Sequence, residues 1–299
     1  MKNPYHISVL VKESIEKLIT DKNGIYIDAT FGGGGHSHAI LNRLDQKATL
    51  IAMDQDIDAV KRNLIKDKRF HLFHTNFIHI EDILKKKQIE KVSGILVDLG
   101  PSYFQITNPK RGFSNQLNCM LDMRMNQESN YSAKHIINEY SKNQLSQLFQ
   151  KYGEFNNAKE IANKILKKRI KKEIITTFDL KNIFFIKGSS KSKKRFFARL
   201  FQSIRIEVNN EINLFQDFLF KSKNIISPGG RMAIISYHSI EDRIAKFFFK
   251  NRMFFMKKND ISRFSFKMIH KKVIKPSVPE IKKNPRSRSA KLRVAEKQI

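Results

Sequence analysis

The first hundred residues alternate short apolar runs with segments of helical spacing. The apolar runs are rich in β-branched and aromatic residues and cover positions 24–30, 48–54, 69–75 and 92–100. The segments between them, 37–44, 57–66 and 80–87, repeat apolar residues at positions i, i+3 and i+4. Strands that alternate with helices at this interval are typical of a parallel sheet built from βαβ units.

After the fourth run the pattern becomes helical and stays so from about residue 108 to residue 210. From residue 211 the pattern predicts one further helix, a Pro-Gly-Gly turn and an apolar run that resumes the sheet. Two later runs, at 263–273 and 289–297, are expected to pair antiparallel at the sheet edge. We therefore expect an α/β protein with a mainly parallel sheet. Residues 1–107 and 211–299 would form the sheet domain, and 108–210 an inserted all-helical domain.

Four consecutive glycines, 32–35, separate the first predicted strand from the first predicted helix. A nucleotide phosphate, an adenosine-type cofactor and a flexible loop would all suit such a stretch. No Gly-Lys dipeptide occurs, which excludes a Walker loop, and Gly-x-Gly-x-x-Gly fails because Ser37 or His38 stands at its third glycine. Asp54 ends the second run 22 residues after Gly32, near the ~20 typical of a ribose-binding carboxylate. Because glycines cost backbone entropy on folding, the pattern favours an adenosine with a short charged tail over a plain turn.

The chain is strongly basic, with 57 Lys and Arg against 28 Asp and Glu and a formal charge of +29. Such a field attracts polyanions, although a genome drifting toward A+T also adds lysines without selection for binding. The charge is clustered: 13 basic and 2 acidic residues lie between Lys164 and Arg199, and 10 and 2 between Lys271 and Lys297. Clustering favours a nucleic-acid-binding surface, formed by a predicted Lys- and Ser-rich loop at 187–195 and by the segment near the end of the sequence. The candidate phosphate ligands are Arg195, Arg286, Arg288 and Arg293.

Several classes of protein are disfavoured. No run of about 18 uncharged apolar residues occurs, so neither a membrane span nor a signal-peptide core is expected. The single cysteine, Cys119, excludes an intramolecular disulfide and a Cys-cluster zinc site, and no other cluster of metal ligands is evident. These features predict a protein of the reducing cytoplasm without a metal.

Six segments carry a family resemblance, in chain order: "HISVLVKESIEKL", "GIYIDATFGGGGHSHAIL", "GILVDLGPSYFQ", "RGFS…LDMRM", "GRMAIISYHSIEDRIAK" and "NPRSRSAKLRVAEK". Together they resemble the bacterial 16S ribosomal RNA cytosine-N4 methyltransferase family. The resemblance implies a class I methyltransferase (Rossmann-like) sheet with an inserted helical domain, and S-adenosylmethionine as cofactor. It also implies N4-methylation of a cytidine in the decoding region, on small-subunit ribosomal RNA or the assembled small subunit.

The same resemblance implies roles for individual residues. Asp98, which ends the fourth run, is a catalytic candidate that would either accept a hydrogen of the cytosine amine or contact the cofactor's amino group. His238 is a second catalytic candidate, because its position at the carboxyl end of the fifth predicted strand would let it touch substrate. The residues expected to bind the cofactor are Gly34, Gly35, His36, Asp54, Phe77, Asp98 and Gln105.

Two alternatives stay open at this stage. One is an amine methyltransferase acting on another nucleic acid, although DNA-type enzymes carry two prolines after the acidic residue where this chain has only Pro101. The other is a non-enzymatic, basic RNA-binding or ribosome-assembly protein. A lack of cofactor binding would distinguish the second.

Overall fold

The computed structural model describes residues 8–250 and 266–298, and the chain divides into two compact units. One comprises Met1–Gly100 and Leu214–Ile299 and is called the sheet unit below; the other comprises Pro101–Asn213 and is called the helical unit. The boundaries expected from the sequence, at 108 and 210, lie a few residues from these.

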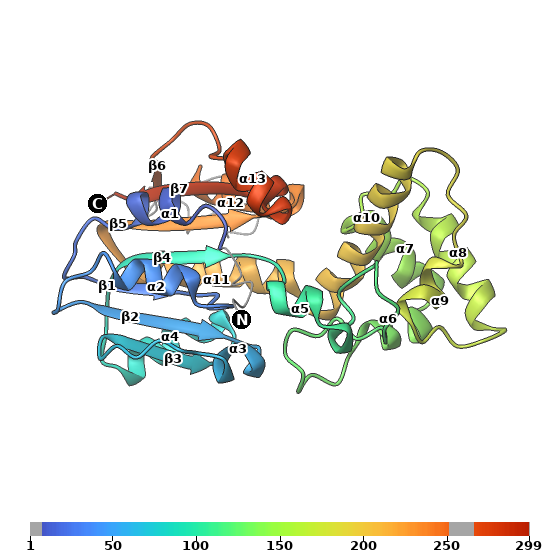
Figure 1. Ribbon diagram of the computed structural model, residues 1–299, viewed down its shortest axis with the longest axis horizontal. Helices are drawn as coiled ribbons and strands as arrows, with labels where there is room; N and C mark the ends of the chain where they lie inside the picture. Colours follow the sequence, from blue (N-terminus) through green and yellow to red (C-terminus); the bar gives the residue numbers. More distant parts are fainter. Residues whose placement is uncertain (1–7, 251–265, 299) are drawn as a thin grey trace, which may run out of the picture. The chain divides into compact units, whose positions relative to one another are not determined.

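The sheet unit contains a seven-stranded sheet in the order β3-β2-β1-β4-β5-β7-β6 (Figure 1). The five strands from β3 to β5 are parallel, and β7 pairs antiparallel with both β5 and β6. The predicted α/β class with an antiparallel edge is confirmed; residues 263–265 of the last expected pair lie outside the described residues. The strands are β1 (Ile25–Asp28), β2 (Thr49–Asp54), β3 (Phe70–His74), β4 (Val92–Asp98), β5 (Ile226–Ser236), β6 (Phe266–Met268) and β7 (Lys291–Lys297).

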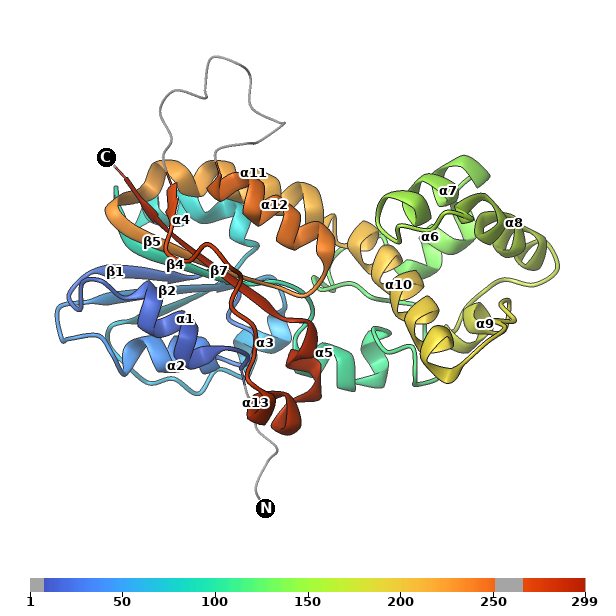
Figure 2. The same ribbon diagram turned by 90° about the horizontal axis from the view of Figure 1, so that it is seen from above.

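Helices cover both faces of this sheet. Figure 2 shows α1 and α2 on one face and α4, α11 and α12 on the other. The helices of this part of the chain are α1 (Val11–Leu18), α2 (Gly35–Leu41), α3 (Ile57–Lys61), α4 (Ile80–Lys86), α11 (Glu211–Ile225), α12 (Ser239–Phe249) and α13 (Val278–Lys283), with 3-10 turns η1 (Phe77–His79) and η4 (Pro285–Ser289).

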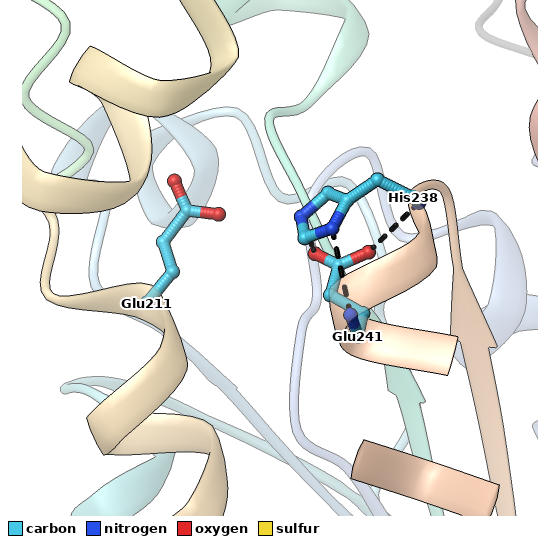
Figure 3. Close-up of side chains that lie close together, drawn as sticks. All are labelled: Glu211, His238 and Glu241. Carbon is cyan, nitrogen blue, oxygen red and sulfur yellow. Dashed lines mark hydrogen bonds and ion pairs between the residues drawn. The ribbon is translucent and has the colours of Figure 1, made fainter. Parts of the chain in front are cut away.

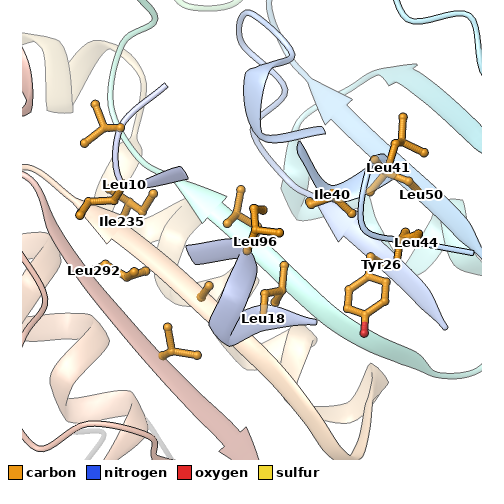
Figure 4. Packing of buried hydrophobic residues seen from close by; sticks show 14 of the residues in the cluster. Leu10, Leu18, Tyr26, Ile40, Leu41, Leu44, Leu50, Leu96, Ile235 and Leu292 are labelled. Atoms are coloured by element: carbon orange, nitrogen blue, oxygen red, sulfur yellow. The ribbon is translucent and has the colours of Figure 1, made fainter. Parts of the chain in front are cut away.

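One hydrophobic core of the sheet unit lies between the sheet and the α1/α2 layer (Figure 4). Leu18 of α1 and Ile40 of α2 are fully buried against Leu96 of β4 and Leu292 of β7. Burial of a side chain of this size stabilises a fold by about 1.5–3 kcal/mol relative to exposure. This layer fixes the start of α2, and with it the glycine loop.

Two expectations about secondary structure in the sheet unit were wrong. The helix predicted over 57–66 ends at Lys61, because Asn63 forms a turn in which its side-chain oxygen accepts the N–H of Ile65. The Pro-Gly-Gly segment is not a turn before β5 but part of that strand. Gly229 adopts φ +77° there, and the register with β4 shifts between Val92 and Gly94, so the glycines accommodate an irregularity within the pairing.

The helical unit is built around buried side chains of its own helices and one buried cation. Arg111 is 2% exposed, and its guanidinium donates to the carbonyls of Arg124 and Met125. The two ends of the "RGFS…LDMRM" motif are therefore joined by these hydrogen bonds, which hold the loop between them in place. The helices are α5 (Tyr103–Thr107), α6 (Ala133–Glu139), α7 (Lys142–Lys151), α8 (Ala158–Arg169), α9 (Thr177–Lys181) and α10 (Ser190–Val208), with the 3-10 turn η2 (Pro109–Arg111). Among the described residues, no helix of either unit has the length and apolar character needed to span a membrane.

Candidate functional site

Three neighbouring parallel strands each end in an aspartate. Asp28, Asp54 and Asp98 are the last residues of β1, β2 and β4, which lie side by side in the sheet (Figure 1). Ligands of open α/β sheets bind at this edge. The carboxyl ends of the strands therefore bring the predicted cofactor residue Asp54 and the predicted acceptor Asp98 to one edge of the sheet unit.

The glycine loop connects β1 to α2 at the same edge. Gly32 and Gly34 have φ values of +55° and +76°, a left-handed conformation that glycine adopts without steric cost. A Cβ on Gly34 would lie 2.8 Å from Cζ of Phe31, and one on Gly35 would lie 2.1 Å from Oγ of Ser8. A Cβ on Gly32 would meet no atom closer than the Thr30 carbonyl oxygen at 3.9 Å. The protein's own packing thus excludes side chains at 34 and 35, whereas open space at Gly32 leaves bare backbone for a ligand.

Asp54 is tied to the glycine loop. Its Oδ2 accepts the N–H of Gly32 at 2.7 Å and its Oδ1 accepts the N–H of Asp56 at 2.8 Å. Burial raises the pKa of Asp54 to about 6, against these two backbone N–H groups, which lower it. The carboxylate is held in one orientation beside the loop, and its remaining lone pairs suit the two hydroxyls of a ribose.

Asp28 is fully buried and has a structural role. Its Oδ2 accepts the hydroxyl of Ser37 at 2.6 Å, which fastens the first turn of α2 to the end of β1. Burial raises the pKa of this carboxyl to about 6, partly offset by the Ser37 hydroxyl.

Asp98 is held between two other side chains of the sheet unit. The hydroxyl of Tyr237 donates to Oδ1 at 2.9 Å, and Nδ1 of His36 lies 3.8 Å from Oδ2. Burial raises the pKa of Asp98 to about 6, while His36 and Tyr237 lower it. The side chain keeps 16% exposure, so the carboxylate is oriented but still accessible. Sequence reasoning missed Tyr237; its place directly after the strand next to β4 was the available signal.

Each ring nitrogen of His36 faces a different neighbour, the carbonyl oxygen of Val9 or the carboxylate of Asp98. Its ring is buried, and Nε2 lies 3.0 Å from the carbonyl oxygen of Val9. Because a carbonyl can only accept, Nε2 carries a hydrogen, and Nδ1 is the nitrogen that faces Asp98. The imidazole thereby links the segment before α1 to Asp98, while the cofactor contact predicted for His36 remains a prediction.

Phe77 and Gln105 also have internal partners. The ring of Phe77, in η1, packs edge-on against Phe218 of α11 with centroids 4.9 Å apart, and the residue is half-buried. Gln105 belongs to the helical unit, where its Oε1 accepts the N–H of Ser102 in a capping box at the start of α5. Contacts of either residue with the cofactor remain predictions.

His238 caps α12. Its Nδ1 accepts the N–H of Glu241, and Nε2 lies 3.0 Å from Oε1 of the same residue (Figure 3). The imidazole is 7% exposed. Both nitrogens face Glu241, so the imidazole caps the helix, and the substrate contact predicted for this histidine remains a prediction.

The basic residues fall into two groups. Arg195, Arg286 and Arg288 are exposed, as a phosphate ligand must be. Arg293 is not such a residue: its side chain is 10% exposed and its Nε donates to Asp242 at 2.7 Å, so it joins β7 to α12. The "KGSSKSKKR" stretch expected to be a loop largely forms the start of α10, which Ser189 caps by accepting the N–H of Ser192.

Replacing Gly34 by Ala tests the glycine loop, with Gly229→Ala as a matched control. The two glycines have φ values of +76° and +77°, but a Cβ at 229 meets nothing within 4 Å. We expect Gly229→Ala to lower the free energy of unfolding by about 1–2 kcal/mol through left-handed strain alone. Gly34→Ala should cost more, because Phe31 must move, and should also weaken cofactor binding. Chemical denaturation and calorimetric titration measure both effects; equal losses in the two variants would contradict this account of the loop.

Comparison with known proteins agrees with this geometry. Residues 3–298 match the model of the MraW methylase family. The chain is 50% identical over 305 residues to the ribosomal RNA small subunit methyltransferase H of Karelsulcia muelleri, covering 99% of each chain. It is 44% identical over 292 residues to the protein of the same name from Flavobacterium psychrophilum, covering 96% of this chain and all of the other. The resemblance found in the motifs is confirmed: the chain belongs to the MraW methylase family, and its methyl donor is S-adenosylmethionine.

Proposed function

We propose that this protein transfers a methyl group to the N4 amine of a cytidine in small-subunit ribosomal RNA. The observation that carries the proposal is the oriented carboxylate of Asp98, at the end of β4 and beside the strand that leads into the glycine loop. Relatives named for methylation of small-subunit ribosomal RNA support the substrate class.

The chemistry requires little more than placement and a charge acceptor. S-adenosylmethionine, when bound, supplies an already activated methyl group; Asp54 and the glycine loop would hold its nucleoside. The N4 lone pair of cytosine is conjugated with the ring and is a weak nucleophile. A carboxylate that accepts an N4 hydrogen localises this pair and stabilises the positive charge that develops on the amine. With a pKa of about 6, Asp98 is mostly ionised at pH 7 and can fill this role.

RNA binding would use the exposed basic residues of both units. The nine residues from Lys187 to Arg195 are all exposed, and five of them are basic. Arg286 and Arg288 offer exposed guanidinium groups on η4. Because the N4 group is hidden in a base pair, the target base must be unstacked, and we assign recognition of the surrounding strand to the helical unit.

The triple variant Lys191→Gln/Lys193→Gln/Lys194→Gln tests the basic start of α10. We expect RNA affinity to fall and the slope of log affinity against log salt to lessen by about 2, since each lost phosphate contact on single-stranded RNA removes ~0.7. A control that removes three exposed lysines of the sheet unit, Lys66, Lys68 and Lys85, should change both quantities much less. Fluorescence anisotropy over a salt series measures them. Equal losses would mean that net charge, and not this surface, binds the RNA.

A transfer assay with radiolabelled S-adenosylmethionine tests the acceptor. Free small-subunit RNA, small subunits lacking the modification and duplex DNA are offered in parallel. We expect label on ribosomal RNA, alone or within the subunit. Label on DNA would favour a different nucleic-acid methyltransferase, and cofactor binding without transfer to any acceptor would refute the proposed substrate.

A further inference from the structure

Tyr237 contacts Asp98, the predicted acceptor, but has no role in the reaction proposed above. Tyr237 follows β5 directly, and β5 pairs in parallel with β4 so that Asp98 lies opposite Ile235. The tyrosine is therefore two residues beyond the register partner of Asp98. From this position its hydroxyl reaches Oδ1 of Asp98 at 2.9 Å, which joins the ends of two central strands.

The tyrosine is itself held in place. Its backbone N–H donates to Oε2 of Glu241 in the first turn of α12 at 2.9 Å. A Cβ on Gly100 would lie 3.6 Å from Cδ2 of Tyr237, so the ring packs against bare backbone just beyond β4. Burial, together with Asp98, raises the pKa of Tyr237 well above its ordinary value, so the hydroxyl keeps its hydrogen and acts as a donor. The bond to Asp98 is therefore a fixed donor-to-carboxylate contact.

We propose that Tyr237 is a positioning residue for the methyl transfer, which fixes the orientation of the Asp98 carboxylate and aims its second oxygen toward the acceptor amine. The effect on catalysis rests on the proposed function, whereas the hydrogen bond between Tyr237 and Asp98 does not. With Oδ1 engaged by Tyr237, Oδ2 is the oxygen near Nδ1 of His36 at 3.8 Å and the one left to accept a new hydrogen.

The charges around Asp98 explain why this donor matters. His36 of α2 favours the carboxylate, as does Tyr237, whereas Asp28 of β1 and Glu241 of α12 are acidic and disfavour it. Glu280 of α13 adds a further acidic group near Tyr237. Burial in such surroundings raises the pKa of Asp98 to about 6 even with both favourable partners present. Removing the hydroxyl therefore shifts the titration of Asp98 upward, toward neutral pH.

Tyr237→Phe tests the inference, because it deletes one oxygen and keeps the ring. We expect the acidic limb of the pH–rate profile to move up by about one pH unit, the scale of a lost hydrogen bond to a charged group. At pH 6 the turnover would be about fivefold below that of the unmodified chain, and by pH 9 within twofold of it. Loss of the same size at every pH would show a merely structural role, and an unchanged profile would show no role; either result overturns the proposal.

Tyr26→Phe is the matched control. Tyr26 is fully buried near the opposite end of β1, where its hydroxyl donates to the carbonyl of Asp21 and accepts two backbone N–H groups. We expect this variant to be less stable while its pH–rate profile stays in place. A shift of the acidic limb in both variants would mean that a general loss of stability, and not the loss of the Tyr237 hydrogen bond, changes the pH–rate profile.

A second readout separates this inference from the proposed function. Carbon-13 NMR of the full chain labelled at aspartate carboxyl carbons follows Asp98 directly, with its signal assigned from Asp98→Asn. The pKa of Asp98 should rise in Tyr237→Phe and not in Tyr26→Phe. If it rises but no acceptor is methylated by the unmodified chain, the pairing stands and the proposed reaction fails. If it does not rise, the inference fails whatever the enzyme methylates.

Discussion

Asp98→Asn should lower the turnover number at saturating cofactor by about 10²–10³-fold, while the chain stays folded. The asparagine keeps the size of the side chain, and its carbonyl oxygen can still accept the hydroxyl of Tyr237. What is lost is the negative charge that stabilises the developing cation, and the loss of one preorganised electrostatic partner costs a factor of this order. Single-turnover transfer to small subunits, with calorimetric titration of S-adenosylmethionine, measures rate and affinity separately.

The same pair of measurements decides between the two roles predicted for Asp98. An acceptor of the amine hydrogen leaves the dissociation constant of the cofactor within a few-fold of the unmodified value. A residue that only contacts the cofactor weakens its binding and leaves turnover at saturation intact. Asp242→Asn is the control: it removes the carboxylate that pairs with Lys291 and Arg293, and should lower stability without changing turnover.

Asp54→Ala should weaken the binding of S-adenosylmethionine by about 10²–10⁴-fold. Two hydrogen bonds between ribose hydroxyls and a carboxylate are lost, and bonds to a charged group are worth about 1.5–3 kcal/mol each. The loop suffers too, because the N–H groups of Gly32 and Asp56 lose their acceptors. Isothermal calorimetry with the cofactor and with its demethylated product measures the effect.

Asp21→Ala is the matched control for this change. Asp21 is an exposed aspartate whose Oδ1 also accepts a backbone N–H, that of Asn23, in the turn before β1. This substitution should leave cofactor affinity unchanged. A loss of less than threefold in Asp54→Ala would show that the ribose binds elsewhere.

The sheet and the place of the site could be predicted because both depend on local patterns. β-branched runs with helical segments between them determined β1 to β4, and the aspartates that end those runs then had to share one edge. The run of glycines identified the loop. At Gly34 the structure adds a constraint that the sequence did not reveal, because a side chain there would meet Phe31, three residues away, while the cofactor contact of Gly34 remains a prediction.

The partners of the site residues could not be predicted, because they come from distant parts of the chain. Tyr237 meets Asp98 across 139 residues and His36 meets Val9 across 27, contacts that exist only once β4, β5 and α2 are packed. For the same reason the sequence suggested Arg293 as a phosphate ligand, whereas in the fold its Nε donates to Asp242 of α12.

The sequence predicted a loop at the start of α10 because its Ser and Gly residues favour turns and caps over helix interiors. Buried residues further along the helix, Leu200, Phe201 and Ile204, hold it in the helical unit, and Ser189 caps its first turn. Tertiary packing of an apolar face supplies most of the stability of a helix in a protein, and here it extends the helix into a polar segment.

The position of the transferred methyl group tests the central claim most directly. Small subunits lacking the modification are treated with the unmodified chain and labelled S-adenosylmethionine, and the RNA is digested to nucleosides and separated against standards. We expect label in N4-methylcytidine, and we expect it to accumulate about 10²–10³-fold more slowly with Asp98→Asn. Label in a carbon-methylated pyrimidine, or in a methylated adenosine or guanosine, would contradict the role assigned to Asp98 as acceptor of the cytosine amine hydrogen.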